Sequence, residues 1–168
     1  MLALVLGLAL LAPPPAVAHE GDAPTHAPTE RVTADGTTVE RSLVVRGTVR
    51  DLVGVLYAVD RWPAVFSDVR AVTARPGGPW ALDFRRFGHP HDFNVRRTGR
   101  GVMLELASAS HGAARLEYAL APVDAEHSEL TVRYFMTTPP TLTPEAVVTL
   151  LRDKAATDLA DFATTAAR

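Results

Sequence analysis

Alternating hydrophobic and polar residues predict a series of short strands through the middle of the chain. Apolar side chains recur at every second position within residues 80–87, 91–97, 102–107, 115–120 and 130–136. Two further short strands are expected at residues 39–46 and 69–74. Gly- and Pro-containing turns separate most of these segments, for example Arg75-Pro76-Gly77-Gly78-Pro79. Such short connections favour an antiparallel meander over a parallel sheet.

The period changes to that of a helix after a Pro-containing link at residues 137–143. Thr143 is a good N-cap, with Pro144 in the first position and Glu145 in the first turn. At 100° per residue one apolar stripe forms, made of Val148, Leu151, Ala155, Leu159, Phe162 and Ala166. A helix running to the C-terminus would be about 35 Å long and could lie across one face of a curved sheet.

Residues 46–69 predict two short helices between the first two strands. Thr48 and Asp51 have the spacing of a capping box, and an Asp-Arg-Trp-Pro corner follows the first helix. This segment resembles the opening of the START-like, or SRPBCC, domains, whose signature is matched here by Asp60, Trp62, Pro63, Phe66 and Val69. The order of elements over residues 37–168 is similar to that family as well.

The resemblance implies an α+β, helix-grip fold. A curved antiparallel sheet of six to seven strands would wrap around the long C-terminal helix, with two short helices after the first strand. It also implies an apolar ligand cavity between sheet and helix. The most similar branches in style are the coenzyme Q-binding and polyketide cyclase/dehydrase-like domains, which include both carriers and enzymes.

Composition limits the classes of partner. The chain has 168 residues, 47% of them hydrophobic, which is enough for one domain with a sizeable core. A net charge of −2 gives no electrostatic basis for nucleic-acid binding. The absence of cysteine excludes disulfides, thiolate metal sites, a Cys nucleophile and a lipoprotein anchor.

The N-terminus predicts export. Residues 2–11 form an apolar run, and Ala16-Val17-Ala18 fits a cleavage site before His19. No basic residue precedes the run, so the alternatives are a start further upstream or an uncleaved interfacial anchor. We therefore expect a signal peptide at residues 1–18, a disordered leader at 19–36 and the ligand-binding domain at 37–168, in a periplasmic or secreted protein.

The expected cavity lining follows from the apolar faces of the strands and the helix. It comprises Trp80, Phe84, Tyr118, Tyr134, Leu151, Asp158 and Phe162. Tyr118, Tyr134 and Asp158 would supply the polar contacts. Asp158 is unusual because it falls inside the apolar stripe, where it could orient a ligand or act as an acid or base. The alternatives are an ordinary salt bridge to Lys154 or a strand arginine, and a core that these side chains simply fill.

Evidence for other chemistry is weak. His89-Pro90-His91-Asp92 resembles a metal fragment but needs His111 or His127 as a third ligand, and a surface turn is the favoured explanation. A mature N-terminal His19 could chelate copper only with rigid partners. Serine-hydrolase, phosphate-loop and dinucleotide motifs are absent. No catalytic residue, metal or cofactor is therefore expected.

The sequence thus favours an exported binding or carrier protein for a lipid, quinone or polyketide-like molecule, with transient membrane contact. One alternative is a cyclase or dehydratase that uses Asp158 or His91 as acid or base. Another is a protein-interaction module of the cell envelope, whose protein partner the sequence does not name.

Overall fold

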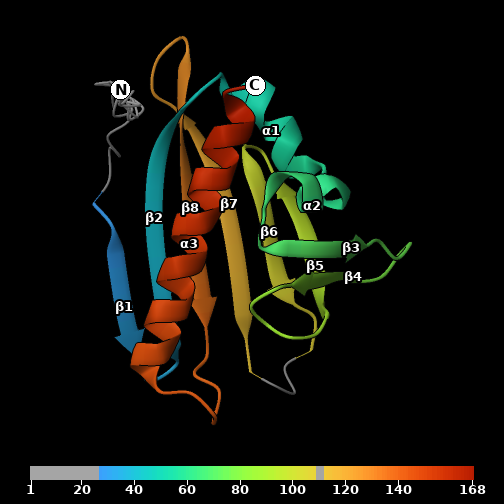
Figure 1. Cartoon of the computed structure of the whole chain (residues 1–168), viewed down its shortest axis with the longest axis vertical. Coiled ribbons are helices and arrows are strands. Elements are labelled where there is room, and N and C mark those ends of the chain that lie inside the picture. Colours follow the sequence, from blue (N-terminus) through green and yellow to red (C-terminus); the bar gives the residue numbers. More distant parts are fainter. Residues whose placement is uncertain (1–26, 109–111) are drawn as a thin grey trace, which may run out of the picture.

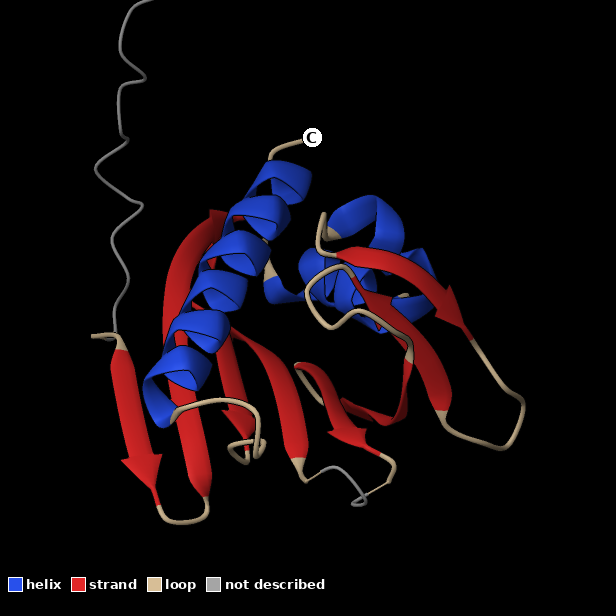
Figure 2. Ribbon diagram, turned by 60° about the horizontal axis from the view of Figure 1, so that its bottom comes forward, coloured by secondary structure: helices blue, strands red, loops and turns tan. Residues whose placement is uncertain are grey.

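A single curved antiparallel sheet and one long C-terminal helix dominate the molecule (Figure 1 and Figure 2). The computed structural model describes residues 27–108 and 112–168. The sheet has eight strands in the order β1-β2-β8-β7-β6-β5-β4-β3. The helix α3 crosses one face of this sheet, and two short helices cover its other end (Figure 2). This arrangement confirms the α+β class and the helix-on-sheet architecture predicted from the sequence.

The elements follow the expected order along the chain. They are β1(Thr29–Thr33), β2(Gly36–Arg46), α1(Val49–Tyr57), the 3₁₀ turn η1(Val59–Arg61), α2(Trp62–Val65), β3(Val69–Thr73), β4(Trp80–Phe84), β5(His91–Thr98), β6(Gly101–Leu106), β7(Ala114–Pro122), β8(His127–Met136) and α3(Pro144–Ala166).

The strand count is higher than the six to seven expected, because β1 forms inside the segment expected to be a disordered leader. All five residues of β1 are exposed, so no hydrophobic alternation marks the strand in the sequence. It pairs with β2 across a tight turn, with Thr33 opposite Gly36. The signal peptide, its cleavage site and the rest of the leader lie outside the described residues.

Local capping explains where the first helix begins. The Thr48 hydroxyl accepts a hydrogen bond from the Asp51 amide and donates one to the Asp51 carboxylate, at 3.3 and 2.7 Å. This pair confirms the predicted capping interaction. Leu52 and Leu56 are buried on the inner face of α1. The corner that follows places Trp62 in the core, where its indole N–H donates to the Leu56 carbonyl at 3.2 Å.

The long helix also begins as predicted. Thr143 caps α3 by accepting a hydrogen bond from the Ala146 amide at 3.3 Å, and Pro144 follows it. The buried stripe starts at Val147, one position earlier than expected, while Val148 is only partly buried. α3 lies mainly against β2 and β8, and its C-terminal half meets α2.

The opposite face of the sheet carries crossed ion pairs. Glu105 pairs with Arg96 and Arg115, and Arg133 pairs with Glu40 and Glu117. These half-exposed side chains form a solvated face, as alternation requires when the other face is buried. Among the described residues, no helix combines the length and apolarity needed to cross a bilayer.

Candidate functional site

Most of the predicted lining residues meet in one buried cluster between the sheet and α3. Those at 2% exposure or less are Phe84, Tyr118, Tyr134, Leu151, Asp158 and Phe162. Trp80, at the start of β4, is half-buried and packs at the edge of the core. The structure therefore brings together all three residues expected to supply polar contacts.

Asp158 lies at the centre of this cluster. The hydroxyl groups of Tyr118 and Tyr134, on neighbouring strands, both donate to Asp158 Oδ2 at 2.6 Å. Lys154 Nζ, one helical turn away, lies 3.0 Å from the same oxygen. Asp158 is fully buried, and the salt bridge to Lys154 that the sequence offered as an alternative is present.

Backbone packing helps to place Tyr118. β6 lies so close to β7 that a Cβ on Gly101 would be 1.9 Å from the Tyr118 carbonyl oxygen. Only glycine avoids this clash. Gly101 therefore allows the pairing that fixes the backbone from which the Tyr118 ring reaches Asp158.

A second carboxylate joins the cluster from outside α3. Asp68 lies just before β3 and is 4% exposed. Its Oδ2 is 3.2 Å from Lys154 Nζ, and its Oδ1 is 3.3 Å from Arg86 Nε. The Lys154 ammonium also lies 4.4 Å from the centroid of the Phe84 ring, a cation–π distance.

The formal charges of this cluster cancel, with Lys154 and Arg86 against Asp68 and Asp158. Cancellation is needed because an unpaired charge inside a core is very unfavourable. The other three charged side chains therefore neutralise the buried Lys154 and leave no net formal charge in the apolar interior.

Burial and the neighbouring carboxylate also act on the two tyrosines. Loss of solvation, followed by the charge of Asp158, raises the pKa of Tyr118 and of Tyr134 well above the ordinary value of 10.0. Both hydroxyl groups therefore stay protonated and act as hydrogen-bond donors at neutral pH.

Aromatic rings fill much of the space beside the charged cluster. The Trp62 ring is 5.0 Å from those of Phe66 and Tyr118, and the Phe66 ring is 6.4 Å from that of Phe162. The sequence left open whether these faces enclose a cavity or a filled core. In this conformation these rings pack against one another.

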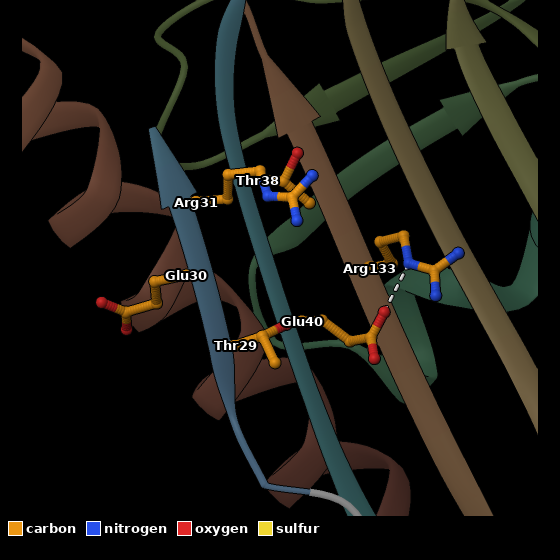
Figure 3. A pocket seen from close by; sticks show the side chains of 6 residues that line it. All are labelled: Thr29, Glu30, Arg31, Thr38, Glu40 and Arg133. Atoms are coloured by element: carbon orange, nitrogen blue, oxygen red, sulfur yellow. Dashed lines mark hydrogen bonds and ion pairs between the residues drawn. The ribbon is translucent and has the colours of Figure 1, made fainter. Parts of the chain in front are cut away.

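Two hollows of the described residues lie at the surface. One, of about 430 Å³, lies over β1, β2 and β8 and is lined by Thr29, Glu30, Arg31, Thr38, Glu40 and Arg133 (Figure 3). Its charged and hydroxyl side chains do not suit a hydrophobic ligand. The other, of about 270 Å³, lies between α2 and the C-terminal end of α3.

The second hollow adjoins a polar boundary that we call the seam. On one side are Ser67, Asp68 and Arg86, and on the other are Lys154, Thr157 and Asp161 of α3. The Ser67 amide and hydroxyl both donate to Asp161 Oδ2 at 2.7 Å. Arg86 Nη2 donates to the Thr157 hydroxyl at 3.1 Å. Together with the Lys154–Asp68 pair, these contacts join α3 to the segments around β3 and β4.

Sequence reasoning did not assign Asp68 or Arg86 to the site and treated Lys154 only as an alternative partner of Asp158. A signal for Lys154 was present, because it is the only lysine among 17 Lys and Arg residues and lies four positions before Asp158. No comparable pattern marks Asp68 or Arg86. Their role depends on contacts distant in sequence.

The histidine segment lies apart from this cluster. The rings of His89 and His91 are 4.3 Å apart, and Phe87 packs against His91. Within the part of the chain that the structure describes, no three His, Asp or Glu side chains are placed to hold a metal ion. His111 is not among the described residues.

Comparison with known proteins adds evidence on the fold. No model of a known protein family matches the chain, and no curated protein matches it. Solved structures do match. A START superfamily protein from Mycobacterium smegmatis superposes with a TM-score of 0.67 at 11% identity, over 77% of this chain and 96% of that one.

The chain therefore has a START-like, helix-grip fold.

Two further structures with this START-like fold resemble the chain. The Zhui aromatase/cyclase from Streptomyces gives a TM-score of 0.63 at 19% identity, over 78% of this chain and 93% of that one. A STAR-related lipid transfer protein from Xanthomonas axonopodis gives 0.62 at 13% identity, over 89% of this chain and 100% of that one.

Proposed function

We propose that this START-like domain is an exported protein that binds and carries a hydrophobic small molecule between the sheet and α3. The ligand would be a lipid, quinone or polyketide-like compound. The observation that carries the proposal is the buried cluster of Asp158, Lys154, Tyr118 and Tyr134 in an otherwise apolar interior. Structures of similar fold named as a lipid transfer protein and an aromatase/cyclase support the same ligand class.

The cluster has the composition of a ligand site. Small-molecule sites combine a mainly apolar wall with a few fixed polar groups that set orientation. A buried ion pair adds little stability compared with well-packed apolar side chains. Lys154 and Asp158, both at 0% exposure, are therefore better explained by binding than by folding.

Entry would occur at the seam, because the aromatic rings beside the charged cluster pack against one another in this conformation. Two of its contacts, Ser67 with Asp161 and Arg86 with Thr157, lie at least partly in water and exchange with solvent at little cost, so the buried Lys154–Asp68 pair is the main contact that opening must break. Opening would expose the Phe66 and Phe162 rings on either side and give access to Lys154. The structure is then the closed form of the carrier.

The cluster favours a carrier over a cyclase. Asp158 Oδ2 accepts hydrogen bonds from two tyrosine hydroxyls and from Lys154, so a substrate would reach this oxygen only by breaking one of them. His91, the other candidate, lies on β5 beside His89 and Phe87. An Asp158→Asn variant that abolished turnover of a polyketone while folding normally would favour the enzyme.

A protein-interaction module is the second candidate. The packing of Trp62, Phe66 and Phe162 favours it, because a filled interior that does not open leaves only the surface for binding. The edge strand β1, whose side chains are all exposed, is one part of that surface that could pair with another strand.

Native mass spectrometry of the protein purified from the cell envelope distinguishes these functions. A carrier should retain a co-purifying mass in the lipid or polyketide range, which organic extraction removes. Ligand-free protein from several lipid-rich preparations would contradict the proposal and favour the interaction module.

Export is tested separately by N-terminal sequencing of the protein from the envelope fraction. Cleavage after Ala18 should make His19 the first residue. An intact Met1 on cytoplasmic protein would contradict export without affecting ligand binding.

A further inference from the structure

Lys154 is the most unusual residue of the interior. It is the only lysine of the chain and is 0% exposed. Its ammonium has three hydrogen atoms to donate and contacts two carboxylates, Asp68 at 3.2 Å and Asp158 at 3.0 Å. The Phe84 ring covers a further side of it.

The two carboxylates differ in what holds them. Asp158 belongs to α3, like Lys154, and is fixed by the hydroxyl groups of Tyr118 and Tyr134. Its position relative to Lys154 is therefore independent of the seam.

Asp68 belongs to the other side of the seam. It precedes β3, its carbonyl accepts from the Arg85 amide at 2.8 Å, and its carboxylate pairs with Arg86. If the seam opens, Asp68 leaves together with its own cationic partner. Lys154 stays behind with Asp158 and loses one acceptor.

The position that the Asp68 carboxylate leaves beside Lys154 suits an anionic group. Both tyrosine hydroxyls already donate to Asp158, so Lys154 is the group there with a hydrogen atom to donate. An anionic oxygen is the strongest acceptor for an ammonium, and a carboxylate reproduces the shape and charge of the departed Asp68 side chain. The Phe84 ring beside Lys154, and the Phe66 and Phe162 rings that pack on each other in the same core, suit hydrocarbon.

We infer that the ligand is a hydrophobic carboxylic acid, whose carboxylate takes the place of Asp68 on Lys154. This inference rests on the proposed carrier function and names its ligand class. Asp68 then acts as an internal substitute for the ligand carboxylate, which keeps Lys154 paired while the site is empty.

Matched ligands test the inference. Dodecanoate and its methyl ester have the same hydrocarbon chain, and their affinities can be measured by titration calorimetry and by tryptophan fluorescence. The acid should bind the wild-type protein at least about tenfold more tightly than the ester, the effect of one charge-assisted hydrogen bond. A matched pair of an aromatic carboxylic acid and its methyl ester repeats the comparison for a ring ligand.

Two variants assign the preference to this site. Lys154→Met should reduce the ratio of acid to ester affinity to about one while the ester still binds. Asp68→Asn should raise the affinity for the acid, because the competing carboxylate is gone. Circular dichroism of each variant checks folding, and Asp68→Asn alone decides the case if Lys154→Met does not fold.

The outcomes separate the two proposals. Equal binding of acid and ester to the wild-type protein, or unchanged acid affinity in Asp68→Asn, would overturn the carboxylic-acid inference and leave the carrier function standing. Failure of acids and esters of both types to bind would count against both.

Discussion

At the scale of single residues, the buried ion pair of Lys154 and Asp158 makes a prediction about stability. Replacing Asp158 by Asn leaves the buried ammonium with one carboxylate partner, and removal of one member of a buried pair costs roughly 3–5 kcal/mol. We expect Asp158→Asn to lower the free energy of unfolding by about 3 kcal/mol in urea denaturation. Asp153→Asn, on the exposed face of the same helix, should change it by less than about 0.5 kcal/mol.

A double-mutant cycle shows whether the effect belongs to the pair. Lys154→Met combined with Asp158→Asn should lose less stability than the sum of the two single changes, because the double variant has no unpaired charge at either position. Additive losses would mean that the two residues do not interact as the 3.0 Å contact indicates.

The raised pKa of Tyr118 and Tyr134 makes a second residue-scale prediction. In the unfolded chain both phenols ionise near the ordinary value of 10.0, while in the folded protein they stay protonated to higher pH. The folded state therefore binds more protons above pH 10, and its stability falls as pH rises. Below pH 10 the contribution is fully present.

The measurement is the free energy of unfolding between pH 8 and pH 11. Each tyrosine should steepen the decline above pH 10 by up to about 1.4 kcal/mol per pH unit. The variant Tyr118→Phe/Tyr134→Phe should show a shallower decline over the same range. Equal slopes in the two proteins would refute the prediction.

At the scale of elements, the seam makes α3 separable from the segments around β3. The Asp161 carboxylate accepts two hydrogen bonds from Ser67, both at 2.7 Å. Asp161→Ala removes both, and we expect the Ser67 amide to exchange with deuterium about tenfold faster. Reaction of Lys154 with an amine-directed reagent should also accelerate, because a weakened seam gives the reagent access to the lysine. The labelling is easy to assign, since Lys154 is the only lysine and the N-terminal amine is its only competitor in this sequence.

Asp153→Ala, on the same helix but away from the seam, is the matched control for Asp161→Ala and should leave both rates unchanged. If Asp161→Ala changes neither the Ser67 amide nor Lys154, the seam is not the weak boundary that we infer. Peptide-level mass spectrometry reads both quantities from one set of samples.

Elements with a strong internal pattern could be predicted from the sequence, and elements held by distant contacts could not. The α3 helix has a cap, a first-turn proline and an apolar stripe, and the strand with Tyr118 has clear alternation. β1 has no apolar stripe and no alternation, because all its side chains are exposed. It is held by its pairing with β2. For the same reason Asp158 was found within its stripe, whereas Asp68 needed the folded chain to bring it to Lys154.

At the scale of the whole molecule, α3 lies mainly on β2 and β8 and reaches the other end of the sheet through α2 and the seam. The charged cluster lies between these two contact regions. A movement that separates α3 from the segments around β3 would open the interior without unpairing any strand. The proposed carrier function therefore depends on one boundary, and closing that boundary permanently should abolish it.

The absence of cysteine allows this to be tested directly. Ser67→Cys and Asp161→Cys place two unique thiols across the seam, where the native side chains are in contact at 2.7 Å. A short, cleavable bis-thiol reagent can join them. The bridged protein should keep its circular dichroism spectrum, lose dodecanoate binding and protect Lys154 from amine-directed labelling. Cleavage of the reagent should restore dodecanoate binding and the labelling of Lys154.

A bridge between Thr149→Cys and Asp153→Cys, on the exposed face of α3, controls for the reagent and should change neither dodecanoate binding nor the labelling of Lys154. Undiminished binding by the seam-bridged protein would show that ligand does not enter between α3 and the segments around β3, because that route would be closed while the site remained in use.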